Sequence, residues 1–146
     1  MVDPESKATK AERLATVKQE IVAQHERSAE SQATRGKRGA MARVLAIVDA
    51  GTFHELDPFV VHRAGELGMD KSHPYGDGVV TGFGEIDGRQ VAIFSQDFSV
   101  FGGSLGEAFA EKVAKLMDLA ERYGCPVMNI WLVPSTIITM SVIAGE

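Results

Sequence analysis

The sequence predicts a single α/β domain in which strand–strand–helix units follow two N-terminal helices. Two β-prone runs, Val79–Phe83 and Gln90–Phe94, flank Asp87-Gly88, a dipeptide that tolerates the positive backbone angles of a type I′ hairpin turn. An amphipathic run with helical spacing comes next, and Gly124 closes it. Cys125–Ile130 is then the next predicted strand. Such a unit buries its faces only when neighbouring elements stack on it.

Length and charge limit the classes of function. A chain of 146 residues has room for one sizeable core, and 45% hydrophobic residues predict that this core is packed. The 15 Lys and Arg residues against 20 Asp and Glu give a net charge of -5, which argues against nucleic acid as a partner. An anionic ligand would therefore need a local group of basic side chains.

The sequence also indicates where the protein works. The single cysteine, Cys125, can form no internal disulfide, and no histidine lies near it, so we expect an inert small hydrophobic residue in a reducing compartment. The N-terminus is charged rather than apolar, which predicts no signal peptide. The run Ile130–Ala144 is short and interrupted by Pro134, so it should not cross a bilayer. We expect a cytoplasmic protein that binds no membrane.

The N-terminal part is predicted to be helical. One amphipathic helix covers Ala8–Arg27, and its narrow apolar stripe, which another element or chain must cover, consists of Leu14, Val17 and Ile21. A second helix covers Ala40–Ala50, with Gly51 at the position of a C-terminal cap. We therefore divide the chain into a helical segment, residues 1–50, and an α/β domain, residues 51–146.

A basic turn lies between these two helices. Arg35, Lys37 and Arg38 alternate with glycines in an otherwise polar stretch. Guanidinium and ammonium groups form charge-assisted hydrogen bonds with phosphate oxygens, so these residues are candidates for anion binding. The alternative is a solvated basic turn without a ligand.

Two more candidates follow the predicted hairpin. Ser95 and Gln96, with Asp97, are polar residues at the end of an apolar strand, where they either carry chemistry or satisfy backbone groups of the turn. Gly102 and Gly103 precede Ser104-Leu105-Gly106-Glu107, which has the spacing of a capping box and predicts that a helix begins there. Free N–H groups at that helix end would suit a phosphate or thioester oxygen, although glycines also serve tight turns.

The histidines offer no comparable candidate. The four of them lack the paired spacing of metal ligands and show no Ser-His-Asp pattern. We therefore predict no metal and assign no catalytic residue.

Three strings of sequence carry a family resemblance. Arg35-Gly36-Lys37 leads to Gly51–Asp57, and the segments Pro74–Gly82 and Phe94–Glu107 follow. Together they resemble the carboxyltransferase β subunits of biotin-dependent propionyl-CoA and acetyl-CoA carboxylases. The resemblance spans roughly Leu14–Ile130. It implies a partial crotonase-like (ClpP/crotonase) fold, a spiral of strand–strand–helix units.

The resemblance also implies a function. Members of that family transfer a carboxyl group from carboxybiotin to the α-carbon of an acyl-CoA, such as propionyl-CoA or acetyl-CoA. The substrate would be a coenzyme A thioester, and the biotin would be carried on a partner protein. Expected partners are a biotin carboxylase or biotin carrier subunit, or a related carboxyltransferase chain, in a homo- or hetero-oligomer. The residues expected to bind CoA are Arg35, Lys37, Arg38, Ser95, Gln96, Gly102, Gly103 and Ser104.

The sequence departs from the family pattern after Ile130. There the family continues into Ser-Gly-Gly-Ala-Arg, whose backbone N–H groups stabilise an enolate oxygen, whereas this chain has Trp131–Thr136. Met140–Gly145 resembles only the strand that leads to a second glycine-rich segment. We therefore expect a module truncated after Ile130 that is inactive alone and needs other chains. The alternative is a non-catalytic paralogue that binds CoA or acts in assembly.

Overall fold

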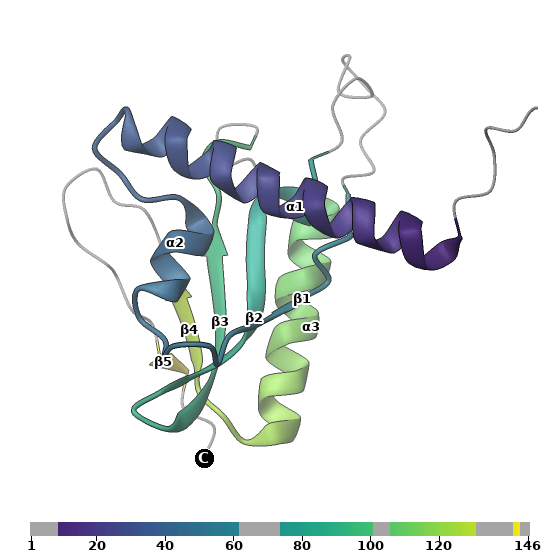
Figure 1. The fold of residues 1–146 in the computed structure, drawn as a ribbon. Coiled ribbons are helices and arrows are strands. Elements are labelled where there is room, and N and C mark those ends of the chain that lie inside the picture. Colours follow the sequence, from purple (N-terminus) through teal and green to yellow (C-terminus); the bar gives the residue numbers. More distant parts are fainter. Residues whose placement is uncertain (1–8, 62–73, 101–105, 131–141, 144–146) are drawn as a thin grey trace, which may run out of the picture.

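The computed structural model describes residues 9–61, 74–100, 106–130 and 142–143, in which five strands form one mixed sheet (Figure 1). The strands, in their order across the sheet, are β1 (His54–Leu56), β2 (Val79–Ile86), β3 (Arg89–Gln96), β4 (Val127–Ile130) and β5 (Val142–Ile143). The other elements are the helices α1 (Lys10–Ala33), α2 (Ala40–Leu45) and α3 (Glu107–Tyr123) and a short 3-10 turn, η2 (Gly76–Gly78).

The pairing of the strands confirms the predicted strand–strand–helix–strand unit. β2 and β3 are antiparallel, whereas β4 runs parallel to β3, with α3 as the crossover between them. The hairpin turn has the predicted geometry, because Asp87 and Gly88 have φ values of 50° and 71° and Ile86 pairs directly with Arg89. The central part of the sheet is therefore a hairpin extended by one crossover.

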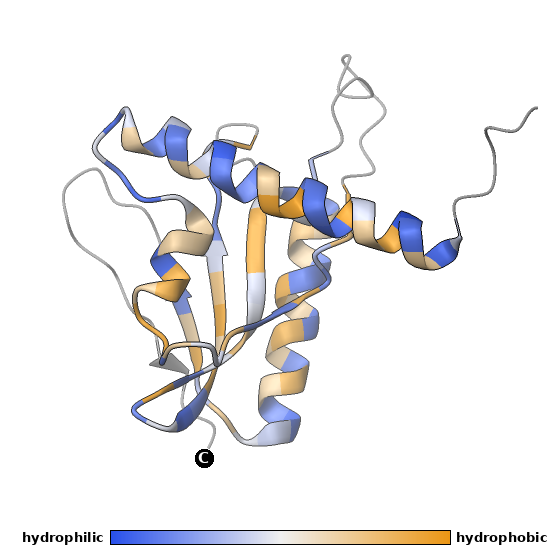
Figure 2. Ribbon diagram, in the orientation of Figure 1, coloured by the Kyte–Doolittle hydropathy of each residue, from blue (hydrophilic) through white to orange (hydrophobic). Residues whose placement is uncertain are grey.

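Helices cover both faces of this sheet. Successive side chains of a strand point to opposite faces. On one face Val80 and Ile93 pack with Val44 of α2, and on the other Val79 and Leu116 share a cluster with the neighbouring strands. The central strands are largely hydrophobic, whereas α1 is mainly hydrophilic (Figure 2). α2 thus shares a core with the sheet. The division of the chain into two segments between residues 50 and 51 stays a prediction.

The first helix is longer than the predicted Ala8–Arg27. It begins after Thr9, whose side chain forms a capping box with Glu12, and continues to Ala33. Its last turns bury Ser28 and Gln32, which are 5% and 2% exposed. The predicted end was wrong because the buried face continues there with polar residues, which an apolar periodicity does not detect.

The second helix is shorter than the predicted Ala40–Ala50, because α2 ends at Leu45. Beyond it, the backbone N–H of Asp49 donates to the carbonyl of Glu85 at 2.8 Å, a bond to the sheet instead of to the helix. The Asp49 carboxylate also accepts both backbone N–H groups of the hairpin turn, at 3.2 and 2.8 Å. Hydrogen bonds to the sheet therefore replace the last helical turn.

The third helix begins later than the capping-box spacing predicted. Its N-cap is Gly106, and no side chain at that position caps it. Ser104, the predicted cap, lies outside the described residues. The carboxylate of Asp77 instead accepts the backbone N–H of Phe109 at 2.9 Å. A residue distant in sequence thus caps the helix, whereas the predicted end at Tyr123, with Gly124 in a left-handed conformation, is confirmed.

Candidate functional site

The carboxyl end of β3 carries the candidate site, and α1 crosses the sheet at this end (Figure 1). The helix is held there by side-chain hydrogen bonds. Gln24 exchanges two bonds of 2.8 Å with the backbone of Tyr75, and Ser28 donates to the Asp97 carboxylate at 2.7 Å. The polar residues on the buried side of α1 therefore determine where this helix lies.

Asp97 is the centre of a small polar network. Its side chain is 4% exposed and accepts hydrogen bonds from the Ser99 hydroxyl and backbone N–H, at 2.7 and 2.9 Å, in addition to the bond from Ser28. Its own backbone N–H donates to the carbonyl of Gly78 at 2.7 Å. Asp97 therefore joins α1, η2 and the turn after β3. This is the structural role that the sequence left open for it.

Arg43 of α2 is buried beside this network, and it was not among the predicted site residues. Its Nη1 donates to the carbonyl of Arg38 at 2.8 Å, and its Nη2 donates to the Ser95 hydroxyl at 3.1 Å and to the Gln96 carbonyl. Burial lowers the pKa of the guanidinium, and the negative charge of Asp97 opposes that shift. Arg43 thus connects the basic turn with the end of β3.

The basic turn presents its charges to solvent. Arg35 and Arg38 are exposed, and Lys37 is half-buried. The backbone of the turn is fixed because the N–H groups of Arg35 and Lys37 both donate to the carbonyl of Gln32, at 3.0 and 2.9 Å. Gly36 adopts a φ of 67°, which a glycine tolerates without strain. The structure therefore links the Arg38 carbonyl to Ser95 and Gln96 through the side chain of Arg43.

Gly102, Gly103 and Ser104 lie outside the described residues, but residues on either side of them are fixed next to η2. A Cβ at Gly78 would lie 3.4 Å from the Val100 side chain, and a Cβ at Gly106 would lie 2.7 Å from the Asp77 carboxylate. Both contacts place the chain at the same end of the sheet as the basic turn.

Lys112 is a second buried cation that was not predicted from the sequence. It is 3% exposed, and its Nζ donates to the carbonyls of Gly76 and Val79 at 3.0 and 2.6 Å. Burial lowers its pKa to about 8, and the carboxylates of Glu55, Asp57 and Asp77 partly offset that effect. α3 and η2 therefore hold each other, because Asp77 caps the helix while Lys112 binds both ends of the turn.

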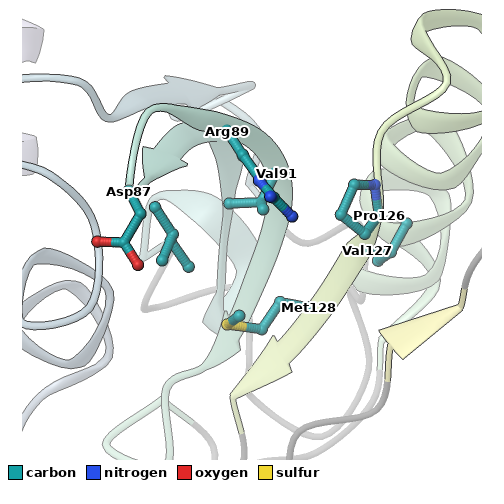
Figure 3. Close-up of a pocket in the computed structure, with 7 residues that line it drawn as sticks. Asp87, Arg89, Val91, Pro126, Val127 and Met128 are labelled. Atoms are coloured by element: carbon teal, nitrogen blue, oxygen red, sulfur yellow. The ribbon is translucent and has the colours of Figure 1, made fainter.

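A cavity of about 520 Å³ lies near the opposite end of β3 (Figure 3). Arg89 extends there toward Pro126, and Met128 lies further along β4. The lining residues are Ile86, Asp87, Arg89, Val91, Pro126, Val127 and Met128. None of them belongs to the candidate site or to the residues predicted to bind a ligand.

Membrane insertion, metal binding and thiol chemistry have little support in the described part of the chain. No helix there is long and apolar enough to span a membrane. No group of three His, Cys, Asp or Glu residues in those ranges could hold a metal ion. Burial raises the pKa of the Cys125 thiol, which disfavours the reactive thiolate.

The fold defines an α/β module of the crotonase-like class, and solved structures of transcarboxylase 12S share this fold. The chain belongs to the family described as the carboxyl transferase domain, whose model matches residues 31–133.

Curated relatives agree with this membership. The chain is 55% identical over 105 residues to the propionyl-CoA carboxylase beta chain of Saccharopolyspora erythraea. The match covers 72% of this chain and 19% of that protein. The chain is 48% identical over 101 residues to methylmalonyl-CoA decarboxylase subunit alpha of Propionigenium modestum, covering 69% and 20%. The chain therefore spans about a fifth of the length of the curated relatives that it matches.

A solved structure also matches. Transcarboxylase 12S, in a structure with hydrolysed methylmalonyl-coenzyme A bound, superposes with a TM-score of 0.76 at 40% identity, over 86% of this chain and 26% of that one. The beta subunit of geranyl-CoA carboxylase from P. aeruginosa, at 18% identity and a TM-score of 0.65, shares the fold alone.

Proposed function

We propose that this chain is a module of an acyl-CoA carboxyltransferase that binds part of a coenzyme A thioester, and that carboxyl transfer requires segments from other chains. The observation that carries this proposal is the position of the basic turn. Arg43 holds it at the carboxyl end of β3, with bonds to Arg38 on one side and to Ser95 and Gln96 on the other.

This position suits an anionic ligand. Ligands of open α/β sheets bind outside the carboxyl ends of the strands, and β3 and β4 are parallel at this point. The chain has a net charge of -5, so a polyphosphate needs local cations. Arg35 and Arg38 are exposed at this end and can form charge-assisted hydrogen bonds with phosphate oxygens. Ser95 and Gln96 are both buried, so we assign them to supporting this site instead of to direct contact.

The chemical step needs more than this module. An enolate at the α-carbon of an acyl-CoA is stabilised by N–H donors aimed at the thioester oxygen, and losing one such donor costs about a hundredfold to a thousandfold in rate. Trp131–Thr136 contains no glycine pair of the kind that would present such donors. We infer that these donors come from other segments, and that residues 9–130 supply CoA binding.

Partners follow from the same proposal. We propose a biotin carrier or biotin carboxylase subunit and a second carboxyltransferase chain, in a cytoplasmic homo- or hetero-oligomer. Of the predicted stripe, Leu14 is 46% exposed and Val17 is half-buried, whereas Ile21 is buried at 7%. Val22, outside that stripe, is a further apolar residue of α1 that is 56% exposed, and these exposed residues support association.

A carboxyl-transfer assay tests the proposed function. The purified chain is mixed with a carboxybiotin carrier and propionyl-CoA, with and without a carboxyltransferase chain that contains both glycine-rich segments. We expect no transfer by the chain alone, together with measurable binding of CoA. Efficient transfer by the chain alone would overturn the need for other chains. An absence of CoA binding would leave only a role in assembly.

A further inference from the structure

We propose that Arg43 is a positioning residue that sets the place of the basic turn relative to the carboxyl end of β3. Arg43 itself need not touch the ligand. It acts through Arg38 and its neighbours, which would meet the CoA phosphates. The inference rests on the proposed function and deepens it, because it names the side chain on which the geometry of the binding residues depends.

The hydrogen bonds of Arg43 reach two segments at once. One nitrogen of the guanidinium binds the Arg38 carbonyl, and the other binds the Ser95 hydroxyl and the Gln96 carbonyl. These acceptors are separated by more than fifty positions in the sequence, so no local turn holds them together. The planar guanidinium fixes their relative orientation, whereas a lysine ammonium in its place is a single point charge.

The charge of Arg43 is deeply buried. The side chain is 6% exposed, and the negative charge that faces it most directly is that of Asp97. The Asp97 carboxylate is itself held by Ser28 and Ser99. Burying a charge costs desolvation free energy that its interactions often do not repay. A cation at this position therefore indicates a requirement other than stability.

Unsatisfied donors support that conclusion. In the described part of the chain, Arg43 Nε and Gln32 Nε2 are buried and have no hydrogen-bond partner. Both residues border the basic turn. The Gln32 carbonyl accepts the N–H groups of Arg35 and Lys37, and Arg43 donates to the Arg38 carbonyl. A buried donor without a partner lowers stability. The arrangement is therefore better explained by where it holds the turn than by the stability it provides.

The first test separates affinity from stability. Arg43→Met keeps a similar volume and removes the bridging hydrogen bonds, while Arg89→Met, at the other end of β3, is a matched control. We expect Arg43→Met to bind CoA at least about tenfold more weakly than the unaltered chain. Its urea midpoint should also fall, because Arg43→Met removes the donor to three acceptors and the cation that faces Asp97, so CoA binding is compared under conditions in which both variants are fully folded. Arg89→Met should bind CoA normally.

The second test restores the missing group. Added guanidinium ion at low concentration should recover CoA binding in Arg43→Ala, and sodium chloride at equal ionic strength should not. Hydrogen exchange gives a readout that needs no ligand. The backbone amides of Arg35 and Lys37 should exchange faster in Arg43→Met than in Arg89→Met, because the turn is then held less firmly.

The outcomes distinguish this inference from the proposed function. If the unaltered chain binds no CoA, the proposed function fails and the inference fails with it. If the unaltered chain binds CoA and Arg43→Met binds it equally well, with unchanged exchange in the turn, only the role of Arg43 is overturned. A loss of affinity that merely parallels a loss of stability, with no rescue by guanidinium, also overturns it.

Discussion

The carboxylate of Asp77 accepts the backbone N–H of Phe109 at 2.9 Å, so an aspartate in η2 caps α3 from 32 positions earlier in the chain. Gly106 gives the carboxylate room to reach the helix end, because a Cβ there would lie 2.7 Å from Asp77 Oδ2. Lys112, on the same helix, binds the carbonyls of Gly76 and Val79 in return. These contacts fix the N-terminus of α3 against η2, at the end of the sheet where β2 begins and β3 ends.

Removing the cap should lower the stability of the domain. Asp77 has a φ of 47°, so Asp77→Gly removes the carboxylate without adding strain to the left-handed backbone. We expect the free energy of unfolding to fall by about 1–2 kcal/mol, as for other lost helix caps. Asp87→Gly, at a φ of 50° in the exposed hairpin turn, is the matched control and should be close to neutral. Urea denaturation of both variants followed by circular dichroism measures the difference, and equal midpoints would show that Asp77 does not cap α3.

Gly106 should be intolerant of a side chain only while Asp77 is present. Gly106→Ala forces the new Cβ against the carboxylate, and we expect it to destabilise the domain by about 1–3 kcal/mol. In the Asp77→Gly background the same substitution should have a smaller effect, because the clashing atoms are gone. A double-mutant cycle of unfolding free energies measures this coupling. Strictly additive effects would contradict the contact.

The hairpin turn provides a test of backbone conformation alone. Gly88 has a φ of 71°, and a Cβ there would meet no atom within 4 Å. Gly88→Val should lower the free energy of unfolding by at least about 1 kcal/mol, because a β-branched residue resists the left-handed region. Gly88→Asn should be milder, since asparagine tolerates that region. Thermal melts of the two variants compare them, and identical melting temperatures would refute a type I′ turn.

Lys112 should make stability depend on pH in the alkaline range. Its pKa is lowered to about 8 in the folded chain from 10.5, so between these values the unfolded chain binds more protons. The contribution of Lys112 to stability is therefore present above pH 10.5 and is lost as the pH falls through about 8. The full difference is about 3 kcal/mol at most, since one pH unit between the two pKa values corresponds to about 1.4 kcal/mol.

The measurement compares unfolding free energies of the unaltered chain and of Lys112→Met across that pH range. The stability of the unaltered chain should rise relative to the variant as the pH increases. Lys18→Met, on the exposed surface of α1, is the control for loss of a lysine. A constant difference between the unaltered chain and Lys112→Met at every pH would show that Lys112 does not titrate as the structure indicates.

The sequence predicted the elements that depend on local signals. The Asp87-Gly88 turn and the strand–helix–strand order from β3 through α3 to β4 follow from turn chemistry and periodicity, and both are confirmed. The end of α3 at Gly124 likewise depends on one glycine in a left-handed conformation. Such features need no knowledge of distant residues.

The elements that were predicted wrongly depend on distant partners. The last turns of α1 are buried through a bond from Ser28 to Asp97, and α2 ends where Asp49 turns to the sheet. The cap of α3 comes from Asp77 instead of the predicted Ser104. Polar residues in these positions look exposed in a sequence, because their partners lie 30 or more positions away.

The candidate site shows the same limit. Arg35, Lys37 and Arg38 were identified by their charge, and whether they bind CoA stays a prediction. Arg43 gave only a weak signal, a charged residue among the apolar positions of a helix. Its bonds to Arg38 and Ser95 depend on tertiary structure.

Calorimetric titration of the purified chain with coenzyme A tests the central claim most directly. The unaltered chain should bind CoA, and binding should weaken as salt increases, because exposed charges are screened. Arg35→Ala should weaken binding by about threefold to tenfold, through loss of a charge-assisted hydrogen bond to phosphate. Arg13→Ala, which removes an exposed arginine from the distant part of α1, should bind like the unaltered chain. The absence of any CoA binding, or an equal loss in both variants, would contradict a CoA site built on the basic turn.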